Sequence, residues 1–167
     1  MTYIKKPSIK ALVEQITSNA TSWIGHHKYD NKDIVGGQTF TTPSDGDLEA
    51  IEVYTSIVTA PGKVIMTLHN FDPLHQSWGP ALGSSSVDFA TTDTGKWKSF
   101  SIPGLHLDKE KSYGFRLESS NCYIGMGEAA GHTPPLVNGQ EWTFVNNDQQ
   151  GKSFSYFSLA FKVAVRA

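Results

Sequence analysis

Large apolar side chains occupy every second position of the C-terminal segment 157–166, and small or polar residues stand between them. The apolar members are Phe157, Leu159, Phe161, Val163 and Val165. Because successive side chains of a β-strand point to opposite faces of the sheet, these five residues form one apolar face. A closing segment of this kind predicts an all-β chain in which one face of the sheet lies against the core.

The same alternation begins near residue 38 and continues in short segments that turn residues separate. Strands are expected at 38–42, 48–56, 64–71, 85–90, 97–102, 113–119, 122–126, 141–145 and 154–166, with long loops at 72–84 and 127–140. Proline and glycine mark the turns between them, because proline fixes φ and glycine allows positive φ. No helical pattern separates these strands. The sequence therefore predicts a two-sheet antiparallel β-sandwich, with a jelly roll as the favoured topology.

Residues 8–24 follow the period of a helix instead. Ile9, Leu12, Val13 and Ile16 stand at positions i, i+3, i+4 and i+7, and Ser8 precedes them as an N-cap residue. This spacing predicts an amphipathic helix, with a polar connector at 26–37. The chain is divided accordingly into a helical arm with its connector, 1–35, and a sandwich domain, 36–167. A short helix is marginally stable alone in water, so its apolar stripe must pack either across the end of its own sandwich or on a neighbouring subunit. Docking on a neighbouring subunit, such as a second copy of the chain, is the favoured alternative.

Charge and composition exclude several classes of protein. The 167 residues carry a net charge of −2 without a basic run, so nucleic acid is not an expected partner. No apolar run approaches the roughly 20 residues of a membrane-spanning helix. The single cysteine, Cys122, rules out an internal disulfide bond. The first residues lack the hydrophobic core of a signal peptide. The location stays open between a virion or particle surface and, for a trimmed chain, the extracellular space.

Several sequence segments resemble those of a known group of domains. They are the segment Gly-Gln-Thr-Phe-Thr-Thr-Pro-Ser-Asp-Gly-Asp-Leu at 37–48, the turn at 60–62, Gly-Lys-Trp at 95–97, Tyr-Gly-Phe-Arg-Leu at 113–117 and Leu-Ala-Phe-Lys-Val at 159–163. Together they resemble the jelly-roll, galactose-binding-like domains of carbohydrate-binding-module type that accompany secreted bacterial enzymes and surface proteins. The resemblance covers about residues 36–165. It implies a β-sandwich with a binding role and supplies no catalytic residues. The predicted N-terminal helix departs from the family pattern.

Motifs for catalysis are missing from the sequence, and one candidate metal site stands out. No His-Glu-x-x-His, His-x-x-x-His or Gly-x-Ser-x-Gly motif occurs. Glu118 and Glu128 are carboxylates of the type that glycosidases use, but nothing singles them out as a pair. We therefore expect no enzymatic activity. Asp45, Asp47 and Glu49 alternate around a turn, which is compatible with a structural calcium ion or with a solvated hairpin edge. No other cofactor is expected.

The long segment 72–84 contains the best candidate for ligand binding. Trp78 offers a flat ring to the C–H face of a sugar, and His75 and Gln76 offer hydrogen bonds to its hydroxyl groups. The alternative is that Trp78 closes one end of the sandwich. Trp97 and Trp142 are expected in the core. Two functions fit: a non-catalytic binding module, glycan-recognising or adhesive and borne by a larger assembly, or a purely structural subunit of a phage virion or injection-type particle.

Overall fold

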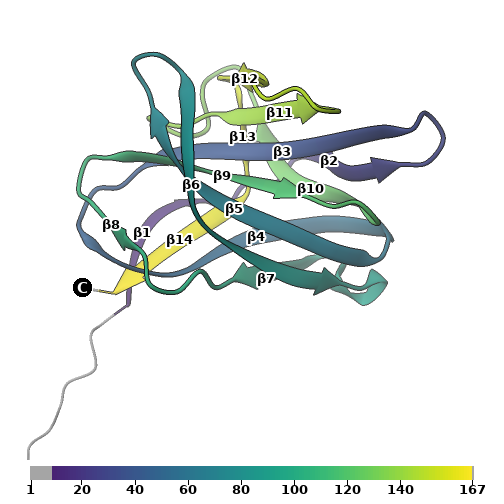
Figure 1. Ribbon diagram of the computed structural model, residues 1–167, viewed down its shortest axis with the longest axis horizontal. Coiled ribbons are helices and arrows are strands. Elements are labelled where there is room, and N and C mark those ends of the chain that lie inside the picture. The colour runs from purple at the N-terminus through teal and green to yellow at the C-terminus, as the bar shows by residue number, and fades with distance from the viewer. Residues whose placement is uncertain (1–8, 167) are drawn as a thin grey trace, which may run out of the picture.

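The computed structural model describes residues 9–166, which fold into fourteen strands and one short 3₁₀ helix (Figure 1). The first seven strands are β1 (Ile9–Gln15), β2 (Ala20–His27), β3 (Lys32–Thr41), β4 (Gly46–Ala60), β5 (Gly62–Asp72), β6 (Ser77–Phe89) and β7 (Lys96–Phe100). The other seven are β8 (His106–Leu107), β9 (Ser112–Glu118), β10 (Tyr123–Ala130), β11 (Glu141–Val145), β12 (Lys152–Phe154), β13 (Phe157–Leu159) and β14 (Phe161–Arg166). The 3₁₀ helix η1 (Thr91–Asp93) lies between β6 and β7.

One antiparallel network of hydrogen bonds joins all of these strands. The main path runs in the order β1-β14-β4-β10-β2-β3-β9-β5-β6. The short strands are added at its sides: β7 and β8 pair with β4, β13 pairs with β10, and β11 pairs with both β3 and β12. This architecture confirms the all-β, antiparallel prediction. The jelly-roll connectivity stays a prediction.

The path folds back on itself, so that strands from its two halves face each other across one core. Phe161 of β14 packs against Phe40 of β3 and Phe115 of β9, with ring centroids 6.0 and 5.6 Å apart. At the other end of the core, Phe89 of β6 lies 6.1 Å from Phe100 of β7. These contacts join the β1-β14-β4 half to the β3-β9-β5-β6 half, as the sandwich prediction requires.

The alternation of the C-terminal segment is confirmed with one difference. Leu159, Phe161, Val163 and Val165 are at most 1% exposed, whereas Phe157 is only half-buried. The chain breaks its pairing at residue 160, so that β13 pairs with β10 while β14 lies between β1 and β4. Phe157 therefore belongs to a separate short strand beside the main core.

The prediction of a helix at 8–24 is wrong. Residues 9–15 form β1 along β14, with Val13 opposite Val163, and β2 pairs with both β10 and β3. Ser8 lies outside the described residues. Of the expected docking stripe, Ile9 and Leu12 lie in β1, Val13 packs on the core and Ile16 is 59% exposed. The division at residue 35 has no counterpart in the sheet, because residues 9–35 supply β1, β2 and the start of β3. A segment rich in β-branched residues fits a strand as well as a helix. Pairing with neighbouring strands determines which of the two structures it adopts.

The prediction of a loop at 72–84 is also wrong for most of that segment. A turn occupies 73–76, and β6 starts at Ser77, so that Trp78 stands in a strand opposite Phe71. The register of β5 and β6 shifts between His69 and Phe71, which places Gly79 and Pro80 at the irregularity. β6 is the last strand of the path, and proline is tolerated at bulges and edges. Within residues 9–166, no helix is long and apolar enough to cross a membrane.

Candidate ligand-binding site

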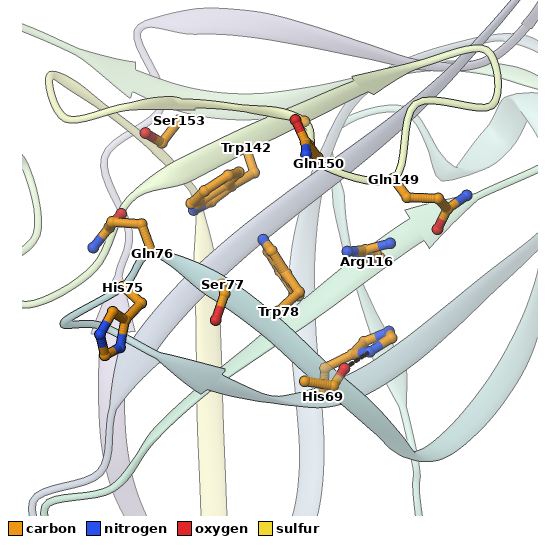
Figure 2. A pocket seen from close by; sticks show the side chains of 12 residues that line it. His69, His75, Gln76, Ser77, Trp78, Arg116, Trp142, Gln149, Gln150 and Ser153 are labelled. Atoms are coloured by element: carbon orange, nitrogen blue, oxygen red, sulfur yellow. Dashed lines mark hydrogen bonds between the residues drawn. The ribbon is translucent and has the colours of Figure 1, made fainter.

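The candidate site lies on the outer side of the β3-β9-β5-β6 half of the sheet. On β9, Phe115 and Leu117 enter the core, so Gly114 and Arg116 point to the opposite face. The same alternation turns His69 of β5 outward. β11, which pairs with β3, and the segment 146–151 border this face, and with β5, β6 and β9 they line a cavity of about 650 Å³ (Figure 2).

An aromatic cluster forms one wall of the cavity, and Trp78 stands at its centre. The ring of Trp78 meets Phe71, Trp142 and Phe144 at centroid distances of 5.5, 5.8 and 5.6 Å, each nearly perpendicular. Such edge-to-face contacts place the positive edge of one ring against the negative face of another. Trp78 is half-buried, while Trp142 and Phe144 are 4% and 2% exposed. Trp142 is therefore buried, but in this outer cluster rather than in the core between the two halves of the sheet. Trp97 lies half-buried on β7.

A glycine makes room for the Trp78 ring. A Cβ atom on Gly114 would come within 2.5 Å of two carbon atoms of that ring. Real Cβ atoms do not approach so closely, so any larger residue at 114 must displace Trp78. The position of the indole is thus determined by β9 as well as by β6.

Arg116 lies next to this cluster with its charge unpaired. Its guanidinium carbon is 4.6 Å from the centroid of Trp78 and 4.0 Å from that of Phe144, within the range of cation–π attraction. No ion pair within residues 9–166 includes Arg116, and its Nε atom is buried without an acceptor. Burial lowers the pKa of the guanidinium, which still carries its charge at neutral pH.

Two further N–H groups in the cavity wall lack a protein acceptor. They are the indole Nε1 groups of Trp78 and Trp142. Leaving a buried donor unpaired costs about 1–3 kcal/mol, so such groups call for an explanation when several gather in one place. With the Nε atom of Arg116, three donors in this cavity have no acceptor from the described protein.

The rim of the cavity is polar. His69 donates from Nδ1 to the carbonyl oxygen of Gly79 at 3.1 Å, and in the neutral ring Nε2 accepts from the Thr67 hydroxyl at 2.9 Å. This neutral form agrees with burial, which lowers the pKa of His69. Figure 2 shows Gln149 and Gln150 on the loop above Trp78 and Arg116.

His75 and Gln76 stand at the mouth of the cavity, in the turn between β5 and β6. The Nδ1 atom of His75 lies 2.7 Å from a carboxylate oxygen of Asp72, and this hydrogen bond lowers the pKa of Asp72. Gln76 has a φ of 50° and donates to the carbonyl of Pro73 at 2.8 Å. The three residues expected to bind a ligand, Trp78, His75 and Gln76, therefore line one cavity.

Sequence reasoning missed Arg116, Gln149 and Gln150. The signal for Arg116 was present, because the alternation that buries Tyr113, Phe115 and Leu117 requires the residues between them to face the other way. The contribution of the two glutamines depends on how the segment 146–151 folds over the sheet, for which no periodic signal exists.

The expected calcium ligands do not converge on one point. Asp45 accepts a hydrogen bond from the amide of Lys109 at 2.6 Å, and Asp47 pairs with His106 at 2.9 Å. Glu49 is engaged by the guanidinium of Arg166, at 2.5 and 2.9 Å. A different exposed group, Asp45 with His106 and Asp108, has its potential ligand atoms within 4.8 Å of one another. Calcium binding stays a prediction.

A second cavity, of about 400 Å³, contains the buried carboxyl groups of Glu128 and Glu141. These residues are 7% and 3% exposed. Burial, together with the hydrogen bond and charge of Glu128, raises the pKa of Glu141 to about 9, so this carboxyl holds its proton at neutral pH. Aromatic side chains, among them Trp23 and Tyr123, form the walls. Glu118 is exposed on β9 and does not line this cavity, so the two glutamates considered from sequence are not a pair.

No family model matches the chain, and no curated protein matches it in sequence. Two solved structures are similar in fold. One is the clostridial cysteine protease Cwp84 after propeptide cleavage, with a TM-score of 0.57 and 11% identity over 95% of this chain and 40% of that chain. The other comprises the cysteine protease and lectin-like domains of Cwp84, a surface layer associated protein of Clostridium difficile. Its TM-score is 0.50 at 12% identity, over 82% of this chain and 32% of that chain.

The chain spans less than half the length of either matched chain. At this level of identity the likeness bears on the fold alone, and it supports the β-sandwich expected from the sequence. A structure of infectious bursal disease virus Gx strain has a TM-score of 0.37, from which nothing is concluded.

Proposed function

We propose that the protein is a non-catalytic carbohydrate-binding module and that its sugar ligand occupies the cavity beside Trp78. The observation that carries this proposal is the combination of an aromatic cluster with three donors that lack a protein acceptor. Sugar-binding sites need both features, because a sugar ring has apolar C–H faces and a rim of hydroxyl oxygens.

The parts of the cavity suit a sugar ring. The exposed part of Trp78 offers a flat apolar surface, and the nitrogen donors beside it match hydroxyl oxygens. Gln76, Gln149 and Gln150 line the same cavity and add amide groups that both donate and accept. The aromatic wall is held by ring contacts on several sides and by Gly114, so little ordering is required when a ligand binds.

The absence of acidic residues from the cavity lining supports a binding role over a hydrolytic one. None of the side chains that line the cavity is a carboxylate. Glycoside hydrolysis generally needs a pair of carboxyl groups on either side of the bond to be cleaved. The buried pair of Glu128 and Glu141 lies in the other cavity. The fold shared with a lectin-like domain of a surface protein is compatible with a module that a larger assembly carries.

Binding of an immobilised glycan array followed by calorimetric titration of the best sugars tests the proposal. We expect Trp78→Ala to abolish binding and Trp97→Ala, a tryptophan outside the cavity, to leave it unchanged. Trp78 also packs in the aromatic cluster, so Trp78→Ala is expected to affect stability as well as binding. The double variant Gln149→Ala/Gln150→Ala, at two exposed residues, separates the two effects, because it should weaken binding without changing the melting temperature. If no sugar binds, the alternative of a purely structural subunit of a virion or injection-type particle takes its place.

A further inference from the structure

The two arginines of the chain differ in their surroundings, and the difference bears on the ligand. Arg166 forms a two-pronged ion pair with Glu49, at 2.5 and 2.9 Å. Arg116 has no carboxylate partner within the described residues, although it is half-buried and therefore poorly hydrated. A buried charge without a counter-ion is costly, so an unpaired arginine at a cavity calls for a negative partner from outside the protein.

The other side chains that line the cavity also favour a negatively charged ligand. No acidic side chain is among its residues, and Arg116 is its only permanently charged group. Burial lowers the pKa of His69, the half-buried histidine of the lining, so this side chain adds no positive charge at neutral pH. Glu118, two residues after Arg116 on β9, lies near enough for its charge to raise the pKa of Arg116, but it forms no ion pair with Arg116 within 4.0 Å and does not line this cavity. The side chains that line the cavity therefore carry a net positive charge.

We propose that the ligand of this cavity is a negatively charged sugar and that its anionic group binds the guanidinium of Arg116. The inference rests on the proposed function and adds the chemical class of the sugar. A carboxylate of a sugar acid and a sulfate ester share the required chemistry, since both offer two oxygen atoms to the N–H groups of an arginine. The terminal Nη groups of Arg116 provide these donors, because they form no hydrogen bond within the described residues, whereas the Nε atom is buried.

Contacts with the rings prepare Arg116 for this role. The faces of Trp78 and Phe144 hold the guanidinium at 4.6 and 4.0 Å, so the group is fixed before a ligand arrives. The sugar ring attached to the anionic group then lies beside Trp78, the residue proposed to contact its apolar face. One tryptophan thus serves both halves of the ligand.

The test compares neutral and charged sugars that are otherwise alike. Oligosaccharides of galactose and glucose are titrated against oligosaccharides of galacturonic and glucuronic acid and against sulfated galactose oligosaccharides. A charge-assisted pair in a partly buried site corresponds to a preference of about 10- to 100-fold for a charged sugar over its neutral parent. The two charged series show whether the anionic group is a carboxylate or a sulfate.

Two variants assign the preference to Arg116. Arg116→Gln should reduce the affinity for the charged sugar to that for the neutral one, while Arg116→Lys, which keeps the charge but not the fork of donors, should retain a smaller preference. Lys63→Gln, an exposed cation outside the cavity, is the matched control and should change nothing. The melting temperature of each variant shows that it is folded.

The outcomes separate the two proposals. If neutral and charged sugars bind equally well, or if the charged preference survives in Arg116→Gln, the charge inference is wrong while the carbohydrate-binding function stands. If no sugar of any series binds, the proposed function itself is wrong and the charge inference falls with it.

Discussion

Replacement of Glu141 by glutamine should make the protein more stable at alkaline pH. Glu141 is 3% exposed, and burial together with Glu128 raises its pKa from 4.5 to about 9. The folded protein therefore keeps a proton that the unfolded chain releases near pH 4.5. The stability that this proton contributes is complete below that pH and is lost as the pH rises toward 9. Glutamine occupies the same volume, donates a hydrogen bond from its amide and does not titrate.

The size of the effect follows from the linkage of protonation to folding. Between the two pKa values, each rise of one pH unit lowers the free energy of unfolding of the wild type by at most about 1.4 kcal/mol. Over the interval from pH 5 to pH 8 the free energy of unfolding therefore falls by at most about 4 kcal/mol, and we expect about 2 kcal/mol because the cavity admits water. No basic side chain lines this cavity to oppose the trend.

Urea unfolding followed by tryptophan fluorescence at several pH values measures this difference. The free energy of unfolding of Glu141→Gln should equal that of the wild type near pH 5 and exceed it at pH 8. The exposed Glu118→Gln is the control and should follow the wild type throughout. Parallel curves for Glu141→Gln and the wild type would refute the reasoning, since they would mean that Glu141 is ionised in the folded protein.

Three further results are expected from the fold. Phe161→Ala, at a side chain that is fully buried between the two halves of the sheet, should lower the free energy of unfolding by about 3–5 kcal/mol in chemical denaturation, and a loss under about 1 kcal/mol would contradict the core assignment. Gly114→Ala should displace Trp78 and weaken sugar binding in calorimetry, whereas Gly131→Ala, with no atom closer than 3.5 Å to its added Cβ, should not. Deletion of residues 1–15 removes β1 and exposes the edge of β14. Light scattering should then show aggregation, and thermal unfolding should have a lower midpoint. An unchanged melting curve would show that β1 contributes nothing to stability.

The inner faces of the strands could be predicted from the sequence because period-two alternation depends only on local geometry. Phe115, Leu117, Phe161 and Val163 are buried as that pattern requires. The N-terminal segment could not be assigned in the same way. Ile9, Leu12, Val13 and Ile16 fit a helical period over a short window, and only the pairing of β1 with β14, across about 150 residues of chain, selects the strand.

The candidate site was predictable in part for the same reason. Trp78, His75 and Gln76 are neighbours in sequence, so their presence in one cavity required only that the chain turn near them. Trp142 and Arg116 reach the same cavity from β11 and β9, and their approach depends on sheet order and on the fold of the segment 146–151. A single sequence carries little information on either.

The indole N–H resonances of the four tryptophans provide the most direct test of sugar binding in this cavity. In a ¹H–¹⁵N spectrum each tryptophan gives one such signal, and single substitutions assign them. On titration with a charged sugar that the array selects, the signals of Trp78 and Trp142 should shift, because both rings line the cavity that the sugar enters, while those of Trp23 and Trp97 should stay in place. Shifts confined to Trp23 or Trp97, or a spectrum unchanged by every sugar tested, would contradict the account.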